Sequence, residues 1–130
     1  MDADLLLFFD RMPYALPLYE ALLRRMQAEI GEIQIKVQKT QISFYRRRMF
    51  GCVSFARVRR RADCPQRWFT LTFGLDRRVD SPRIEAAAEP YPNRWTHHVL
   101  LTCLDDLDET VMGWVEEAYQ IGRASCRERV

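Results

Sequence analysis

The only two imidazole side chains of the chain, His97 and His98, are adjacent in the sequence. Imidazole is the side chain that titrates nearest neutral pH, so either residue could serve as a base or as a metal ligand. Residues 95–102 are expected to form a strand, and neighbours on a strand point to opposite faces. We therefore do not expect the pair to hold one metal ion together. One alternative that the histidines leave open is a small enzyme that uses either His97 or His98.

The cysteines give no sign of a metal or disulfide framework. They form no CxxC or CxxH pair, and they lie at Cys52, Cys64, Cys103 and Cys126. Scattered cysteines in a reducing compartment are most often small buried apolar residues. A Cys/His nucleophilic pair can be drawn with any of them, but no local motif supports one. The five glycines form no phosphate-binding loop. We predict no catalytic residue, no metal and no cofactor.

Basic residues are concentrated in the middle of the chain. Residues 34–94 contain 14 basic and 5 acidic side chains (+9), whereas residues 1–33 contain 3 and 6 (−3) and residues 95–120 contain 0 and 6 (−6). This pattern indicates either an anion-binding region or a charged sheet that acidic helices neutralise. The candidate ligand-binding residues lie between two strands and in two polar segments, at Arg46, Arg48, Arg77, Arg78, Arg83, Arg94 and His98.

A nucleic-acid-binding accessory domain is the other alternative. Aromatic residues that could stack on bases accompany the basic segment, at Tyr45, Phe50, Phe55 and Trp68. A basic patch is nevertheless the weakest of the nucleic-acid signals. Several phenylalanines also fit the core-facing side of their strands, as Phe44, Phe55, Phe69 and Phe73 do. Nucleic acid is therefore kept as an alternative partner.

The elements that must position these residues follow from hydrophobic periodicity. Apolar residues at three- and four-residue spacing predict helices over residues 4–12 and 15–30. Alternation then predicts strands over 33–38, 42–44, 49–58, 68–73 and 95–102. Residues 84–89 fit either a helical turn or an edge strand, and residues 59–67 and 90–93 read as loops. Asp105 is expected to cap a last helix that runs to Ala118. The prediction is an α+β domain with a mainly antiparallel sheet of about five strands, N-terminal helices and a C-terminal helix packed on one face.

The ends of the chain set the expected domain and its location. Residues 121–130 read IGRASCRERV, which resembles the translation of a common sequencing adapter. We therefore expect one domain over residues 1–120 and a non-native tail over 121–130. Without the tail's three arginines and one glutamate, the net charge of +2 falls to zero. No apolar run approaches the ~20 residues that span a bilayer. Asp2 and Asp4 stand where a signal peptide is positively charged. We expect a cytoplasmic protein with no membrane partner.

Several motifs in order resemble the bacterial domain-of-unknown-function family 5655. They are KTQISF at 39–44, RRRMF at 46–50, LDRRVDSPRI at 75–84, EPYPNRWTHH at 89–98 and the acidic segment 105–119, and only the alanines at 86–88 depart from the pattern. The resemblance covers roughly residues 14–120 and implies an α+β domain without an established activity. Our leading hypothesis is a non-enzymatic binding or interaction module for an anionic ligand or a protein partner. The sequence leaves the oligomeric state open.

Overall fold

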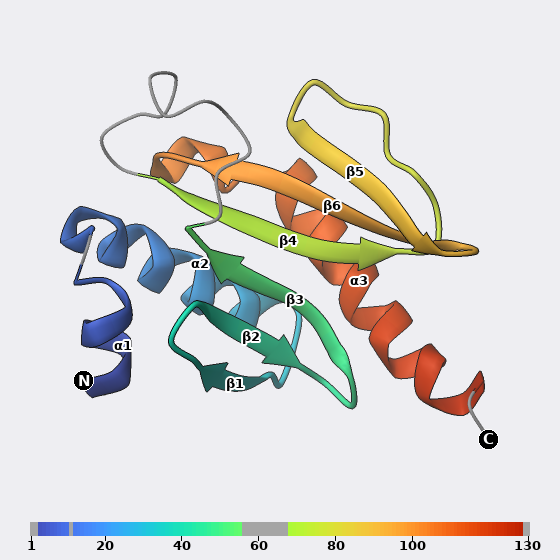
Figure 1. Cartoon of the computed structure of the whole chain (residues 1–130), viewed down its shortest axis with the longest axis horizontal. Helices are drawn as coiled ribbons and strands as arrows, with labels where there is room; N and C mark the ends of the chain where they lie inside the picture. The colour runs from blue at the N-terminus through green and yellow to red at the C-terminus, as the bar shows by residue number, and fades with distance from the viewer. Residues whose placement is uncertain (1–2, 11, 56–67, 129–130) are drawn as a thin grey trace.

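The computed structural model describes residues 3–10, 12–55 and 68–128, with residues 91 and 122–128 described in their backbone only. Figure 1 shows three α-helices around one sheet. The helices are α1 (Ala3–Phe8), α2 (Leu16–Glu29) and α3 (Glu109–Glu128), with short 3₁₀ turns η1 (Pro13–Ala15) and η3 (Leu104–Asp106). The strands are β1 (Gln34–Val37), β2 (Gln41–Tyr45), β3 (Met49–Ser54), β4 (Phe69–Leu75), β5 (Ile84–Tyr91) and β6 (Arg94–Leu101).

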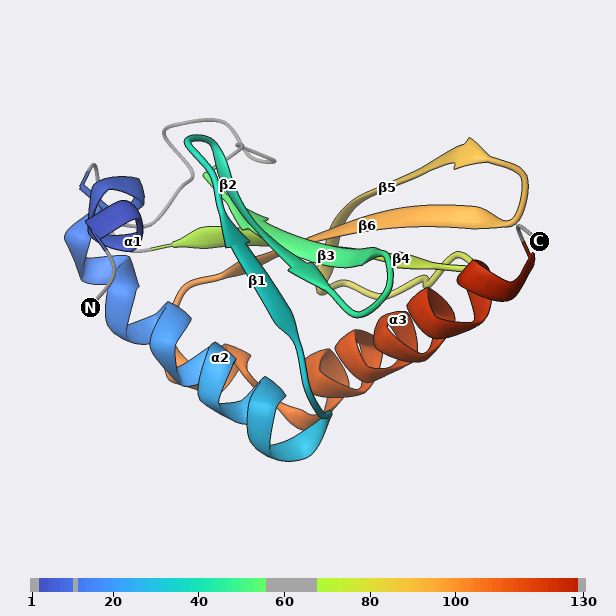
Figure 2. The same ribbon diagram turned by 90° about the horizontal axis from the view of Figure 1, so that it is seen from below.

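The six strands form one sheet in the order β1-β2-β3-β4-β6-β5, and each neighbouring pair is antiparallel. Helices α2 and α3 both lie against the same face of this sheet (Figure 2). The predicted α+β architecture is confirmed. We call the helix-covered face the inner face of the sheet and the opposite one the outer face.

The sixth strand is the segment that the sequence left ambiguous. Residues 84–91 pair with β6 and form one edge of the sheet. The loop expected over 90–93 is therefore shorter, because residues 90 and 91 belong to β5. Pro90 is compatible with this position because proline is tolerated in edge strands and at bulges, and the β5–β6 register shifts between Ala88 and Tyr91. Asn93 turns the chain with a φ of 61°, a conformation that Asn adopts more readily than most residues.

The core lies between the inner face of the sheet and helices α2 and α3. Fully buried side chains from all three layers contribute, among them Leu18, Leu22, Met26, Ile42, Phe44, Val53, Leu71, Phe73, Val99, Leu101, Val111 and Val115. Each such side chain contributes roughly 1.5–3 kcal/mol when it is buried. Because the apolar residues of the strands face inward at every second position, their polar neighbours face the other side of the sheet.

The start of the last helix differs from the prediction. Asp105 is exposed in η3, and Asp108 caps α3 instead, since its Oδ1 accepts a hydrogen bond from the Val111 N–H at 3.0 Å. Three carboxylates within four residues all suit a helix start, and the extra 3₁₀ turn moves the cap three residues along the chain.

Other boundaries shift by a few residues. The first helix ends at Phe8, and a turn follows it. The strand expected over 49–58 extends from Met49 to Ser54, and both its last predicted residues (56–58) and the loop expected over 59–67 lie outside the described residues. The backbone of α3 continues through the first eight residues of the predicted tail. Across the described ranges, no helix combines the length and the apolar character needed to cross a membrane.

Candidate anion-binding site

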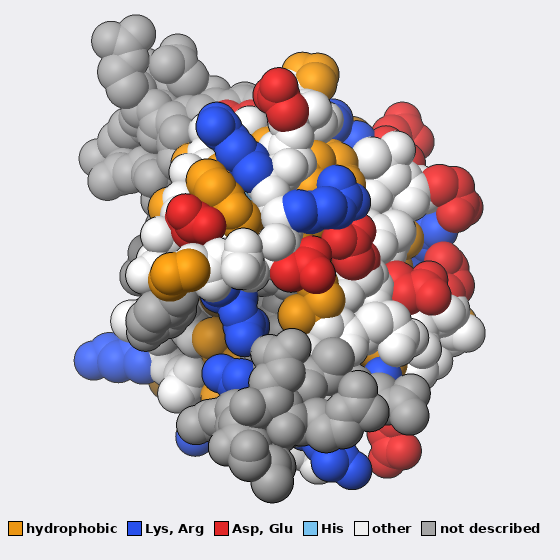
Figure 3. Space-filling view, turned by 90° about the vertical axis from the view of Figure 1, so that its right-hand side faces the viewer, with side chains coloured by type: hydrophobic (Ala, Val, Ile, Leu, Met, Phe, Trp, Pro, Cys, Tyr) orange, Lys and Arg blue, Asp and Glu red, His pale blue; other side chains and the backbone are white. Residues whose placement is uncertain are grey.

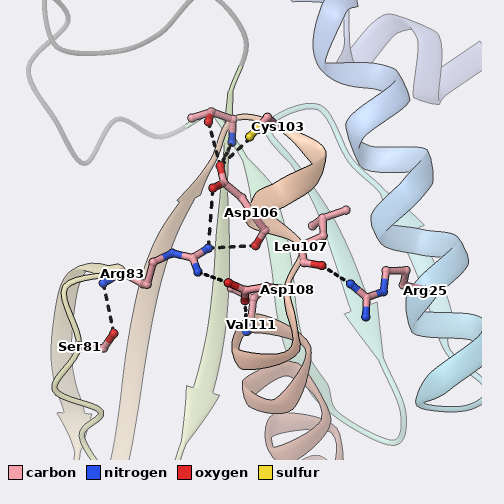
Figure 4. A network of polar contacts seen from close by, with 9 residues as sticks. Arg25, Ser81, Arg83, Cys103, Asp106, Leu107, Asp108 and Val111 are labelled. Atoms are coloured by element: carbon pink, nitrogen blue, oxygen red, sulfur yellow. Dashed lines mark hydrogen bonds and ion pairs between the residues drawn. The ribbon is translucent and has the colours of Figure 1, made fainter.

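The seven predicted ligand-binding residues do not form one cluster. Arg83 lies on the inner side, where it joins the start of β5 to the start of α3 (Figure 4). Its guanidinium donates to Asp108 Oδ2 at 2.6 Å and to the Asp106 carbonyl oxygen at 2.9 Å. In the same region Arg25 of α2 donates to the Leu107 carbonyl oxygen. Arg83 therefore links the segment before β5 to the 3₁₀ turn η3 and to the start of α3.

The carboxylates around Arg83 are held in the charged form. A backbone hydrogen bond from Val111, together with Arg83, keeps the pKa of Asp108 below its ordinary value. Burial alone would raise the pKa of Asp106, but hydrogen bonds from Thr102 and Cys103 and the charge of Arg83 outweigh it, so that pKa is lowered as well. The positive charge of Arg83 is thus already matched within the protein.

Arg46, Arg77 and Arg78 also have partners within the protein. Arg77 forms a two-pronged ion pair with Glu117 of α3, at 2.7 and 3.0 Å. The guanidinium carbon of Arg46 lies 4.2 Å from the centre of the Tyr119 ring, also on α3. Arg78 stands 5.7 Å from the centre of the Trp95 ring. Arg46 and Arg77 thus contact α3 directly, and Arg83 contacts Asp108, which caps it.

Arg48 and Arg94 meet at a cavity on the outer face. The cavity has a volume of about 350 Å³ and lies over β3, β4 and β6, next to the turn that joins β5 to β6. Its lining consists of Arg48, Met49, Phe50, Gly51, Cys52, Thr72, Phe73, Gly74, Pro90, Pro92, Arg94 and Thr96. Clefts that bind small molecules usually measure about 300–1,000 Å³, so this one is at the lower end of that range.

The sheet topology explains why these two arginines lie together. Strands β3 and β6 are both antiparallel to β4, so they run in the same direction. Arg48 stands just before β3 and Arg94 begins β6. Both side chains therefore belong to the same end of the sheet, although 46 residues of sequence separate them (94 − 48).

Among the residues that the structure describes, Arg48 and Arg94 differ from Arg77 and Arg83 in having no ion pair, and from Arg46 and Arg78 in having no ring contact. Neither guanidinium forms a hydrogen bond, ion pair or ring contact with any residue in the described ranges. Thr72 and Thr96 line the same cavity, as does the apolar Met49. Phe50 also lines it, but its ring packs in the core against Phe44 and Tyr119. An arginine guanidinium binds carboxylate and phosphate oxygens through paired hydrogen bonds. The cavity thus combines unpaired positive charge, hydroxyl groups and an apolar wall.

His98 lies on the outer face but belongs to a polar row beside the cavity. It pairs across β4 with Thr72, whose Oγ1 is 2.9 Å from His98 Nδ1. Thr72 pairs in turn with Cys52 of β3. Burial lowers the pKa of His98 and raises the pKa of Cys52. At neutral pH this row consists of a neutral imidazole, a hydroxyl group and a thiol.

His97 points the other way, as alternation along the strand requires. It is fully buried on the inner face, its ring stacks on Phe73, and its Nε2 accepts a hydrogen bond from the Val79 N–H at 2.9 Å. Its Nδ1 is buried without a hydrogen-bond partner among the described residues. Burial lowers the pKa of His97, and the nearby backbone of Trp95 offsets only part of this effect. His97 therefore acts in the core as a neutral acceptor that fixes the loop before β5.

Sequence reasoning missed most of the cavity lining. Thr72 and Cys52 belonged to no motif, and Thr96 was not singled out within the segment 89–98. The available signal was their position on the outer side of their strands. Within the described part of the chain, no three His, Cys, Asp or Glu side chains gather into a metal-binding group. On the face drawn in Figure 3, basic side chains are interspersed with acidic and hydrophobic ones and do not form a continuous basic surface.

Comparison with known proteins identifies a family but no characterised relative. No curated protein and no solved structure matches the chain. The model of the family described as "Domain of unknown function (DUF5655)" matches residues 8–122. This match covers every strand of the sheet, helix α2 and the part of α3 that packs on the core. The chain belongs to the DUF5655 family.

Proposed function

We propose that this domain binds a small anionic ligand in the outer-face cavity, through Arg48 and Arg94. The observation that carries this proposal is that two arginines without partners in the described residues, one just before β3 and one at the start of β6, line one cavity. An unpaired guanidinium next to apolar walls binds an anion with a more favourable free energy than a fully solvated guanidinium does, because its surroundings screen the charge less.

The cavity favours a ligand that is anionic at one end and apolar at the other. Met49 lines one part of the cavity, and Pro90 and Pro92 line the part near the turn that joins β5 to β6. Such walls suit the body of an organic carboxylate or phosphate, whereas a free inorganic anion would leave them uncovered. The hydroxyl of Thr96 adds a further donor for anion oxygens. The ligand class is therefore a small organic acid or phosphate ester.

Arg77 and Arg83 support a different role. Both are engaged with carboxylates of α3 or of the segment just before it, at distances of 2.6–3.0 Å. An external anion would have to displace these internal carboxylates. We infer that they dock the last helix onto the sheet, and that the binding site draws on the remaining cations, Arg48 and Arg94.

Isothermal titration of the full chain with phenyl phosphate tests the proposal, with benzyl alcohol as the neutral ligand of similar size. We expect binding of phenyl phosphate only, and at least a roughly tenfold weaker affinity in Arg48→Gln and in Arg94→Gln, since each loses a charge-assisted contact of about 1.5–3 kcal/mol. Arg47→Gln is the matched control, because Arg47 is the exposed neighbour of Arg48 and does not line the cavity. Equal loss in all three variants would point to general surface charge and contradict the proposal.

Nucleic acid remains the second candidate, favoured by the exposed Lys36, Lys39 and Arg47 on neighbouring strands and turns. A nucleic-acid site predicts binding of a single-stranded oligonucleotide that weakens steeply with salt. In that case Arg47→Gln would weaken oligonucleotide binding as much as Arg48→Gln does. If neither phenyl phosphate nor the oligonucleotide binds at low salt, a protein partner is left as the explanation for the positive charge at the rim of the cavity.

A further inference from the structure

We infer that Gly74 determines which ligands the outer-face cavity accepts, and that the accepted class is a flat aromatic ring that carries an anionic group. The inference rests on the proposed anion binding by Arg48 and Arg94, and it specifies the other end of the ligand. The feature that carries it is the cavity floor, by which we mean the backbone at Phe50 and Gly74, where two adjacent strands present no side chain to the outer face.

The first gap in the side chains of the outer face is at Gly74 of β4. Phe73 and Leu75 on either side of it are buried in the core, so position 74 faces outward by alternation. Its partner across the sheet is Thr96 of β6, and both residues line the cavity. Gly74 therefore leaves only backbone exposed there, whereas the preceding outward position of β4 has the side chain of Thr72.

The second gap is at Phe50 of β3. Gly51 of β3 pairs with Phe73 of β4. One position further along these antiparallel strands, Phe50 stands opposite Gly74. The register of β3 against β2 shifts at this point, and Phe50 is the extra residue of the resulting bulge. Its ring turns into the core and is only 5% exposed, which agrees with the tendency of bulges to redirect a side chain next to a binding site.

The fold itself does not need a glycine at position 74. Among the described residues, the nearest atom to a Cβ built at Gly74 is the Trp95 carbonyl oxygen, at 4.0 Å, and the φ of Gly74 lies outside the left-handed region. Gly51 differs, since a Cβ there would stand 2.8 Å from the Thr72 carbonyl oxygen. Glycine inside a strand weakens the strand and often marks a place where a ligand approaches the backbone closely. We therefore assign Gly74 to ligand binding.

The shape of the floor favours a flat ring. Adjacent strands lie about 4.8 Å apart, and successive outward positions on one strand about 6.6 Å apart. A side chain missing from each of two strands thus leaves room for about one aromatic ring. Such a ring contacts the backbone over its whole face, whereas a puckered ring touches it at a few atoms only, and each lost contact reduces the dispersion attraction.

The charged end of the cavity lies next to this floor. Cys52 and Thr72 are directly paired and line the cavity on one side of Gly74. On the other side, towards the end of the sheet, Arg48 stands just before β3 and Arg94 begins β6. A ring on the floor can therefore direct its anionic group towards both guanidiniums.

Isothermal titration of the full chain with three phosphate monoesters tests the inference. Phenyl phosphate has a flat ring, cyclohexyl phosphate has a puckered ring of similar size, and methyl phosphate has no ring. We expect the wild type to bind phenyl phosphate several-fold more tightly than cyclohexyl phosphate. In Gly74→Val, whose side chain covers the floor, phenyl phosphate should bind at least about tenfold more weakly. The affinity for methyl phosphate should change less than about threefold, because this ester needs only the arginines.

Gly74→Ala and Gly113→Ala form a matched pair that separates folding from binding. Gly113 is an exposed residue of α3, and a Cβ there meets no described atom within 4 Å. Both substitutions should leave the thermal midpoint unchanged or raise it by a few degrees, because alanine reduces the conformational entropy of the unfolded chain. Only Gly74→Ala should weaken phenyl phosphate binding. A clear fall in the midpoint of Gly74→Ala would assign this glycine to the fold and overturn the inference.

Failure of the floor and failure of the anion site give different results. If Arg48→Gln weakens phenyl phosphate binding but Gly74→Val does not, or if Gly74→Val weakens methyl phosphate equally, the role of Gly74 is wrong and the anion site stands. Equal affinity of the wild type for phenyl and cyclohexyl phosphate would reject the flat ring as the ligand class. If the wild type binds none of the three esters, the anion site is rejected and the inference about Gly74 with it.

Discussion

Replacing Arg83 by methionine should destabilise the domain by about 2 kcal/mol. Two charge-assisted hydrogen bonds would contribute about 3–6 kcal/mol if they were fully buried. The Arg83 side chain is 31% exposed and that of Asp108 is 42% exposed, and exposed ion pairs contribute about 0.2–1 kcal/mol. The contribution of the Arg83 contacts to the free energy of unfolding lies between these limits. A loss of about 2 kcal/mol corresponds to a fall in Tm of roughly 8 °C for a domain of this size.

Urea unfolding followed by circular dichroism measures this loss, with Arg77→Met as the control. The Arg77–Glu117 pair has a similar geometry, but the Arg77 side chain is 55% exposed, so we expect a loss of about 0.5 kcal/mol there. A double-mutant cycle with Asp108→Asn isolates the Arg83–Asp108 interaction, because asparagine keeps an oxygen to cap α3. A loss in Arg83→Met no larger than that in Arg77→Met would refute the reasoning.

The same pair gives a pH signature with a defined sign. The pKa of Asp108 and that of Asp106 are both lowered in the folded protein. Their contribution is therefore fully present above the ordinary aspartate pKa of about 3.9 and is lost as the pH falls below it. The difference in unfolding free energy between the wild type and Arg83→Met should stay constant from pH 7 to about pH 5. It should shrink as the pH falls towards 3, and a difference that instead grows on acidification would contradict this account.

Two further predictions concern the interior of the sheet. Burial lowers the pKa of His97, which accepts a hydrogen bond from Val79, so the unfolded state takes up a proton at a higher pH than the folded state does. The free energy of unfolding should therefore fall below about pH 6.5, by up to about 1.4 kcal/mol per pH unit. His97→Gln should flatten this slope in urea unfolding measured at several pH values, and an unchanged slope would assign it to other groups. Gly51→Ala would place a Cβ 2.8 Å from the Thr72 carbonyl oxygen, so β3 would have to shift away from β4. We expect the free energy of unfolding to fall by about 1–3 kcal/mol. An unchanged thermal midpoint would show that the two strands adjust freely.

Alternation and periodicity were sufficient to predict the architecture, because a strand or helix that is buried on one side has apolar residues at regular intervals in the sequence. The strands around Ile42, Val53, Phe69 and Val99 follow this rule, since each places its apolar residues on the inner face. The segment at 84–91 was ambiguous because its alanines carry little signal of their own, and its pairing with β6 decides its conformation. The cap of α3 could not be chosen among three aspartates, because which one caps depends on a 3₁₀ turn that only tertiary contacts stabilise.

The candidate site could be predicted only in part, because it depends on which strands are neighbours. Sequence proximity grouped Arg83 with Arg77 and Arg94 with His98. The sequence of a polar segment, however, does not indicate on which face of the sheet its side chains lie. Once the order β3-β4-β6 is known, the shared direction of β3 and β6 brings Arg48 and Arg94 to one end of the sheet. The same order lines up Cys52 with His98, which are 46 residues apart (98 − 52).

Four arginines of the basic middle segment therefore fall into two pairs with separate explanations. Arg77 and Arg83 face carboxylates that belong to α3 or immediately precede it, and this part of the charge is accounted for by docking an acidic helix onto a basic sheet. Arg48 and Arg94 have no such partner among the described residues and stand on the side of the sheet that the helices leave uncovered. Charge neutralisation explains the first pair without any ligand. It does not explain the second pair, since a cation that lines a cavity gains nothing for folding until an anion joins it.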